Sequence, residues 1–200
     1  MFTGLIQAIG EVQNIQKISG EQRFEVNLKD LIQHKLEIGE SIAINGACHT
    51  LESLIGNIGL FFSSAETLDK TNLINLKPKE LVNLELSLTP NTRMGGHFVS
   101  GHIDGLAKLL SIQNLNQSYL LHFELLPKLS KYLIEKGSIT LNGISLTIAK
   151  KEKNSSVFSV AVIPHTWQNT NLKNLKIGQL LNCEVDLLAK YIENFREVYN

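Results

Sequence analysis

The strongest constraint on this chain is an internal repeat. Three blocks of sequence occur twice in the same order, at residues 2–12 and 99–109, 41–51 and 138–148, and 64–88 and 162–188. The offset between the two copies stays at about 97 to 99 residues, and both copies keep an Asn-Gly pair, Asn45-Gly46 and Asn142-Gly143. Agreement of three blocks in order and spacing indicates a duplication.

The period of the repeat predicts two tandem domains. Solenoid units span about 20 to 50 residues, so a period of about 100 residues leaves each copy long enough to bury a core of its own. We expect the first domain at residues 1–97, the second at 98–186, and a separate C-terminal segment at 187–200. The polar, turn-rich stretch Thr89–Gly96 is the predicted linker.

Within each copy, apolar residues mostly alternate with polar ones. Segments 23–28, 41–45 and 82–86 show this period of two, which predicts half-buried strands, and the Asn-Gly pairs are strong signals for tight turns between strands. Short antiparallel strands must hide their edges, and closure into a barrel does so. The predicted fold is therefore all-β: two similar six-stranded antiparallel Greek-key barrels, with short helices at roughly 31–36 and 129–136.

The C-terminal segment has a helical pattern with no counterpart after the first copy. Its apolar residues recur at intervals of three and four, which predicts an amphipathic α-helix with one apolar stripe: Leu188, Tyr191, Ile192, Phe195, Val198 and Tyr199. The stripe could pack against its own barrel. Alternatively, it could pair with copies of itself in an oligomer.

The composition excludes several classes of function. Lys plus Arg (19) equals Asp plus Glu (19), so the chain lacks the basic surface that nucleic-acid binding requires. No apolar run is long enough to span a bilayer, and the N-terminus lacks the features of a signal peptide, so we expect no membrane association and a cytoplasmic location. Cys48 and Cys183 form neither a zinc motif nor a disulfide framework.

Residues that differ between the copies are the candidates for chemistry. Cys48 corresponds to Ser145, and is either a nucleophile or a small buried hydrophobic residue. His97 and His102 lie in a glycine-rich segment and could transfer protons, bind metal or be exposed; the metal interpretation lacks a third ligand. Ser41, Lys136 and Asp186 are polar residues at predicted strand ends. The chain contains no nucleotide-binding or hydrolase motif.

Taken together, five motifs are similar to those of the riboflavin synthase family. They are MFTGLI at the N-terminus, NGxCxT at 45–50, GGHxxxGHID at 95–104, KGSIxLNGISLT at 136–147 and IPHT at 163–166. The resemblance implies that two molecules of 6,7-dimethyl-8-ribityllumazine exchange a four-carbon unit, giving riboflavin and 5-amino-6-ribitylaminouracil without a metal or redox cofactor. It further implies a homotrimer joined by C-terminal helices, a reacting pair held between the barrels of two subunits, and a possible association with lumazine synthase.

The resemblance also assigns residues to two pockets. The first would use Gly4, Leu5, Ile6, Cys48, His49, Thr50, Phe62, Ser63, Ser64, Ala65, Glu66 and Thr67. The second would use Gly101, His102, Ile103, Lys136, Ser145, Leu146, Thr147, Ala161, Val162, Ile163, Pro164, His165 and Thr166. His102 is the candidate for proton transfer; Cys48, Ser41 and Asp186 are candidates to activate the acceptor, and His97 completes the catalytic set.

Two features depart from the family pattern, and one rival function stays open. His49 stands where the family usually has an apolar residue, and the linker at 87–94 differs from the more usual acidic, alanine-containing one. The rival is a lumazine- or flavin-binding antenna protein of the same fold, which needs no asymmetric catalytic set. A flavin reductase would need a nicotinamide domain, for which the chain has no room.

Overall fold

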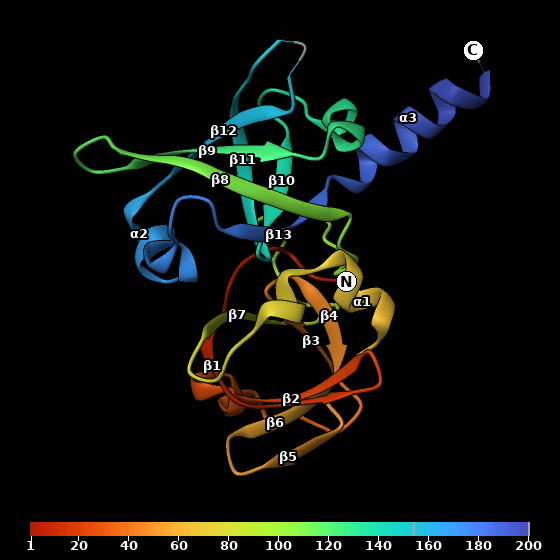
Figure 1. Ribbon diagram of the computed structural model, residues 1–200, viewed down its shortest axis with the longest axis vertical. Coiled ribbons are helices and arrows are strands. Elements are labelled where there is room, and N and C mark those ends of the chain that lie inside the picture. Colours follow the sequence, from red (N-terminus) through yellow and green to blue (C-terminus); the bar gives the residue numbers. More distant parts are fainter. Residues whose placement is uncertain (154, 200) are drawn as a thin grey trace.

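The computed structural model describes residues 1–153 and 155–199 and places the two copies in two stacked units (Figure 1). The first unit contains β1 (Ala8–Ile18), β2 (Glu21–Asn27), β3 (Ser41–Ile44), β4 (Ala47–Thr50), β5 (Ser53–Ile55), β6 (Ile58–Ser63) and β7 (Leu81–Leu86). Its helices are α1 (Ala65–Lys70) and the 3₁₀ helices η1 (Lys29–His34) and η2 (Asn72–Asn75).

The second unit repeats this order of elements. It contains β8 (Gly105–Asn114), β9 (Tyr119–Leu125), β10 (Ser138–Leu141), β11 (Ile144–Lys151), β12 (Val157–Val162) and β13 (Leu180–Val185). Its helices are α2 (Pro164–Gln168), the 3₁₀ helices η3 (Pro127–Tyr132) and η4 (Asn171–Asn174), and the C-terminal α3 (Leu187–Tyr199). The short helices predicted at 31–36 and 129–136 are therefore 3₁₀ helices that begin two residues earlier than expected.

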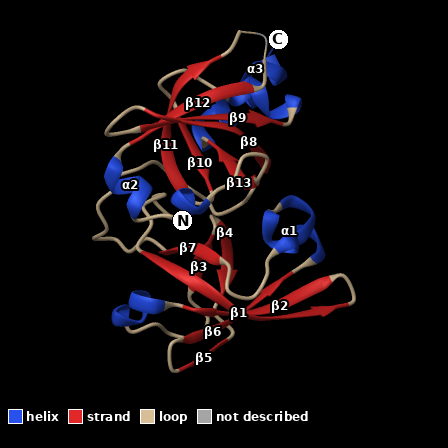
Figure 2. Ribbon diagram, turned by 60° about the vertical axis from the view of Figure 1, so that its left-hand side comes forward, coloured by secondary structure: helices blue, strands red, loops and turns tan. Residues whose placement is uncertain are grey.

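Both units have the same antiparallel topology. Among the described residues, the second unit is a closed six-stranded barrel in the order β10-β11-β12-β9-β8-β13. The first is a seven-stranded sheet in the order β4-β3-β7-β1-β2-β6-β5, open between its two end strands. The predicted all-β fold of two similar barrel-like units is confirmed, and Figure 2 shows the strands of each unit wrapping around their own centre.

The extra strand of the first unit arises because one long strand is broken. In the second unit, β11 runs from β10 to β12 with a register shift between Ile148 and Lys150. At the equivalent point in the first unit, the Leu51 N–H donates to Glu40 O and the Glu52 N–H donates to Leu60 O, so the chain turns from β3 toward β6. The bulge of one unit is a break in the other, and β4 and β5 together replace β11.

Each unit buries its own core, as alternation in the strands predicted. In β2, Gln22, Phe24 and Val26 point inward while the residues between them are half-buried or exposed. The core of the first unit is formed by side chains such as Val12, Phe24 and Phe61, and a separate cluster fills the second barrel. Because burial alternates along the strands, each unit has an apolar inner face, and the chain has two separate cores.

The two Asn-Gly turns meet where the units contact each other. Asn45, Gly46, Asn142 and Gly143 all have positive φ angles, which is the geometry of the tight hairpin turn that the sequence predicted. A Cβ atom added to Gly46 would lie 2.6 Å from the Gly143 backbone nitrogen. Glycine is therefore required at these turns both for conformation and for the close approach of the two backbones.

A buried asparagine network surrounds these turns and repeats across the contact. Asn83 donates from Nδ2 to the Asn142 carbonyl at 2.9 Å, and Asn182 donates to the Asn45 carbonyl at 2.9 Å. The side-chain oxygen of Asn83 also accepts from the Asn171 N–H of the other copy, at 2.8 Å. Each unit thus forms hydrogen bonds to buried polar groups of the other. This mutual bonding explains why both the Thr-Asn-Leu triplet and the Asn-Gly pair occur in each copy.

The helix α3 projects away from the second barrel in Figure 1. Its predicted apolar stripe is exposed: Leu188 is 64%, Ile192 67% and Phe195 60% accessible. The opposite side meets the barrel through charged groups, because Lys131 of η3 contacts Glu193 and Glu197. The expected segment ran to residue 200; Asn200 and the side chain of Tyr199 lie outside the described residues. No helix in the described chain has the length and apolar character needed to cross a membrane.

Candidate active site

Each copy of the sequence contains a short loop that contacts the barrel of the other copy. We call these loops the first crossing loop (Thr3–Gln7) and the second crossing loop (Ser100–Asp104). Gly4 O accepts a hydrogen bond from the Ser145 N–H at 2.8 Å, and Gly101 O accepts from the Cys48 N–H at 2.9 Å. Both glycines have positive φ angles, and a Cβ on Gly101 would lie 2.7 Å from that of Cys48. Only glycine lets these loops pass so close to the facing strand.

A buried glutamate holds each crossing loop. Glu85 accepts hydrogen bonds from Thr3 and from the Gly4 N–H, and Glu184 accepts from Ser100 and from the Gly101 N–H. Burial raises the pKa of Glu85, and these hydrogen bonds oppose that effect by stabilising the charged form. The sequence held the signal for both residues, since an Asn-x-Glu triplet ends each copy, but no role was predicted for them.

The first cavity lies between the first barrel and the second crossing loop. Its volume is about 280 Å³, and it is lined by Ala47, Cys48, Glu66, Thr67, Lys70, Thr71, Gly101, His102 and Ile103. Cys48, Glu66 and Thr67 therefore share a pocket with Gly101–Ile103, although the sequence assigned that loop to the second pocket. The prediction followed chain order, whereas the structure exchanges the two crossing loops between the barrels.

The exchange has a counterpart at the second barrel. The first crossing loop contacts Ser145 through Gly4, and a Cβ on Gly4 would lie 2.6 Å from the Ser145 Cβ. Beside this contact, Ile6 lines a larger groove of about 810 Å³ together with residues of α2 and η4. Gly4 and Ile6, which were predicted for the first pocket, contact the second barrel instead.

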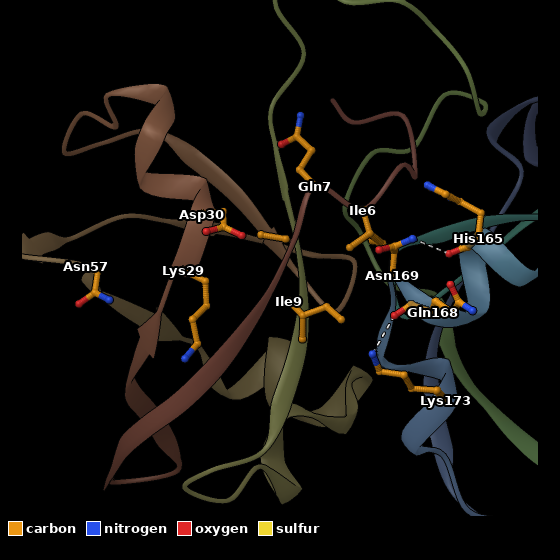
Figure 3. Close-up of a pocket in the computed structure, with 11 residues that line it drawn as sticks. Ile6, Gln7, Ile9, Lys29, Asp30, Asn57, His165, Gln168, Asn169 and Lys173 are labelled. Atoms are coloured by element: carbon orange, nitrogen blue, oxygen red, sulfur yellow. Dashed lines mark hydrogen bonds between the residues drawn. The ribbon is translucent and has the colours of Figure 1, made fainter.

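The second groove is polar and draws on both units. Figure 3 shows Lys29 and Asp30 of η1 on one side, and His165, Gln168 and Asn169 on the other. Asn169 donates to the His165 carbonyl at 2.9 Å, and Lys173 donates to the Gln168 carbonyl at 2.8 Å. The lysines of this groove, and Lys70 of the first cavity, were missed by sequence reasoning because a lone lysine gives no pattern.

Three catalytic candidates lie around the first barrel. Cys48 is half-buried and packs against Phe2, Ala43 and Val99, and it lines the first cavity together with the exposed His102. Ser41 pairs with Thr50, and Ala43 pairs with Cys48. Opposed residues share a face, and so do residues two apart on one strand, so Ser41 lies on the same sheet face as Cys48. Cys48 is thus packed and also borders the cavity, and both interpretations of it stay predictions.

The other two catalytic candidates lie at the second barrel. His97 Nδ1 is 2.7 Å from the Ser145 hydroxyl, and its Nε2 is 3.1 Å from the Thr140 hydroxyl. Burial lowers the pKa of His97, and the negative charge of Asp186 opposes that shift. His97 therefore belongs to a different set of contacts from His102, although the two lie five residues apart in sequence.

His49 and Ser63 point into the first barrel and away from its cavity. His49 is 3% exposed; its Nδ1 donates to the Ala47 carbonyl at 2.8 Å, and its Nε2 accepts from the Ser63 hydroxyl at 2.9 Å. Burial lowers the pKa of His49 to about 4, so the imidazole is neutral at pH 7. His49 is a satisfied core residue.

The remaining predicted residues fall into three groups. Leu146 and Val162 are buried in the core of the second barrel. Ser64 caps α1 by accepting from the Thr67 N–H, and Phe62 lies under the guanidinium of Arg23. Partly or fully exposed positions complete the set: Leu5, Thr50, Ala65, Lys136, Thr147, Ala161, Ile163, Pro164, His165 and Thr166. Within residues 1–153 and 155–199, no group of three His, Cys, Asp or Glu side chains could hold a metal ion.

Comparison with known proteins agrees with this duplicated architecture. The sequence matches the lumazine binding domain family twice, over residues 3–87 and 100–186. It is 42% identical over 195 residues to the riboflavin synthase of Actinobacillus pleuropneumoniae, covering 98% of this chain and 89% of that protein. It is 34% identical to the riboflavin synthase of Bacillus subtilis (strain 168), with the same coverage. The solved structure of LumP complexed with riboflavin shares the fold, with a TM-score of 0.85 at 23% identity over 92% of this chain and 99% of that one.

Proposed function

The chain belongs to the lumazine-binding family and, within it, to the riboflavin synthases, and from this premise we propose how it converts lumazine to riboflavin. In the reaction, one molecule of 6,7-dimethyl-8-ribityllumazine gives a four-carbon unit to a second. The products are riboflavin and 5-amino-6-ribitylaminouracil. The atoms of two substrate molecules equal those of the two products, so the exchange needs no oxidant or reductant.

The observation that carries this proposal is the pair of related but unequal sites. Each barrel meets a crossing loop from the other copy through the same backbone hydrogen bond, to Cys48 in one case and to Ser145 in the other. Two identical substrate molecules need two similar sites, whereas donor and acceptor roles require those sites to differ. Holding two reactants together in the right orientation can supply several kcal/mol of the barrier reduction.

The residues of the first cavity suit proton transfer. The donor lumazine must lose a proton from its C7 methyl group, and an imidazole that titrates near neutrality is the common choice for such a step. His102 lines the cavity and is exposed, so it is our candidate for this role. Cys48 and Ser41 are the candidates in this barrel that would activate the acceptor, and Asp186 is the candidate of the second barrel. His97 completes the proposed catalytic set.

We further propose that the protein is a homotrimer held by α3. The apolar stripe of this helix is exposed while ion pairs on the other side attach it to η3, and packing against copies of itself would bury this apolar area. In that assembly the reacting pair would lie between the first barrel of one subunit and the second barrel of the next. Association with lumazine synthase and a cytoplasmic location stay predictions.

A turnover assay tests the proposed reaction. Purified protein is incubated with the lumazine, and riboflavin is followed by its absorbance while the remaining lumazine is quantified. We expect one riboflavin for every two lumazine molecules consumed. Binding without turnover would instead support the antenna class.

Sedimentation tests the proposed assembly. We expect the full chain to sediment as a trimer and a chain ending at Asp186 to sediment as a monomer without turnover. A monomeric full-length protein that still forms riboflavin would contradict the site between subunits.

A further inference from the structure

The second crossing loop is held at both ends by β13. At its start, Glu184 accepts hydrogen bonds from Ser100 and from the Gly101 N–H. At its end, the Asp104 N–H donates to Cys183 O, and the Asp104 carboxylate accepts from the Val185 N–H at 2.9 Å. His102 lies between these two anchors, so the position of its imidazole depends on both.

One of these anchors also contacts the C-terminal helix. The other carboxylate oxygen of Asp104 is 2.7 Å from the Lys190 ammonium, and the two side chains are only 21% and 27% exposed. Lys190 lies in the first turn of α3, where its N–H donates to the Asp186 carbonyl. An ion pair shielded in this way is stronger than a fully exposed one. The helix is therefore joined directly to the loop that carries His102.

The first crossing loop shows that the charge of Asp104 is not needed to anchor the backbone. Gln7 occupies the equivalent position, and its side-chain oxygen accepts from the Leu86 N–H at 2.8 Å, as Asp104 does from Val185. A neutral amide thus suffices for that hydrogen bond. The second copy has in addition a carboxylate and a lysine partner, and it is the copy that α3 follows.

We propose that Lys190 is a positioning residue that couples the C-terminal helix to the first cavity, by holding Asp104 and with it the loop that carries His102. The proposal rests on the riboflavin synthase reaction proposed above. Its consequence is that the contact between Asp104 and α3, the helix proposed to join the subunits, sets the geometry of a reacting group in the first barrel. Lys190 itself touches no substrate.

The test uses four single variants of the full chain and one double variant. Lys190→Met removes the charge and keeps most of the side-chain length, Lys190→Arg keeps the charge, and Asp104→Asn keeps an acceptor for the Val185 N–H. Lys131→Met is the matched control, because Lys131 anchors the same helix to η3 through Glu193 and Glu197 without contacting the loop. For each protein, kcat, KM, sedimentation and the melting temperature are measured.

We expect Lys190→Met and Asp104→Asn each to lower kcat about tenfold, with little change in KM, because a displaced catalytic group loses orientation. Lys190→Arg should recover kcat to within about twofold, and Lys131→Met should match the wild type. The double variant Lys190→Met/Asp104→Asn should be no slower than either single variant, since both changes break one interaction.

Four results would overturn the proposal. They are unchanged turnover in Lys190→Met, an equal loss in Lys131→Met, additive losses in the double variant, and a Lys190→Met protein that loses its assembly together with its activity. The last result would place the role of Lys190 in assembly alone. A wild-type protein that forms no riboflavin would instead refute the proposed function.

Discussion

The first crossing loop presents Leu5 at the position where the second crossing loop presents His102. The two loops share their glycine, their glutamate anchor and their backbone hydrogen bond to the facing strand, which carries Ser145 in one barrel and Cys48 in the other. The contacts that build the loops are duplicated, while the side chains beside the cavities are not. The comparison teaches that duplication preserved the scaffold of both sites and let their chemistry diverge.

The asparagine network is the part of the molecule where the comparison predicts equality. Asn83→Ala and Asn182→Ala each leave buried groups of the other unit without partners, among them the carbonyl of Asn142 or of Asn45. We expect each substitution to lower the free energy of unfolding by about 2 to 4 kcal/mol, because unsatisfied buried polar groups cost about 1 to 3 kcal/mol each. Urea unfolding of both variants measures this, and losses that differ by more than about 1 kcal/mol would break the equivalence of the two copies.

The crossing loops are where the comparison predicts a difference. His102→Gln should lower kcat by about 100-fold with little change in lumazine affinity, since general acid–base groups contribute about 10²- to 10⁴-fold. Leu5→Gln makes the same side chain at the matched position of the other loop, and we expect it to change kcat by less than about threefold. Steady-state kinetics of both proteins tests the pair, and unchanged turnover in His102→Gln would refute the role of His102.

The barrel interiors differ at a hydrogen-bonded pair that contains a buried histidine. His49 and Ser63 of the first barrel correspond to Leu146 and Val162 of the second, which are buried apolar residues. The folded pKa of His49, about 4, lies below its unfolded value, so the unfolded chain binds the additional proton as the pH falls. Stability is fully present above about pH 6.5 and falls below it, by about 2 kcal/mol at pH 5.

Urea unfolding at pH 7 and pH 5 measures this loss. The double variant His49→Leu/Ser63→Val, which copies the second barrel, is the control and should lose about 2 kcal/mol less than the wild type over the same interval. Because the pKa of His97 is also lowered by burial, His97 contributes in the same direction to both proteins and cancels in the difference. Equal losses in the two proteins would contradict a neutral, buried His49.

Much of this fold could be predicted because local signals agreed with each other. The Asn-Gly turns, the alternating strands and the helical spacing after Asp186 each rest on near neighbours in sequence, and the structure contains all three. The pairing of pockets could not be predicted in the same way. Gly101 reaches Cys48, and Gly4 reaches Ser145, across the contact between the units, and the sequence of either copy alone is equally compatible with loops that stay on their own barrel.

Individual side-chain roles were predictable only where a pattern marked them. Cys48 and His102 stood out because the other copy has different residues there, and both line the first cavity. The resemblance to the family, rather than the comparison of the copies, assigned His49 to a pocket, and His49 lies in the core instead. A strand directs alternate residues to opposite faces, and the sequence did not fix which face was inward. Glu85 and Glu184, identical in both copies, drew no attention for the opposite reason.

The smallest difference between the copies concerns the helices beside the two sites. Ser64 caps α1 by accepting from the Thr67 N–H, whereas Ile163, with a similar extended backbone, begins α2 without a side-chain cap. Ile163→Ser should therefore stabilise α2, and Ser64→Ala should destabilise α1, each by about 0.5 to 1 kcal/mol. Trp167 lies in α2 and is the only tryptophan in the sequence. Its ring stacks on that of Tyr119 in β9, with the ring centroids 3.9 Å apart, so its fluorescence reports directly on α2. Fluorescence-detected unfolding should thus shift upward in Ile163→Ser; an unchanged midpoint would mean that Pro164 already fixes the start of α2 as firmly as a cap does.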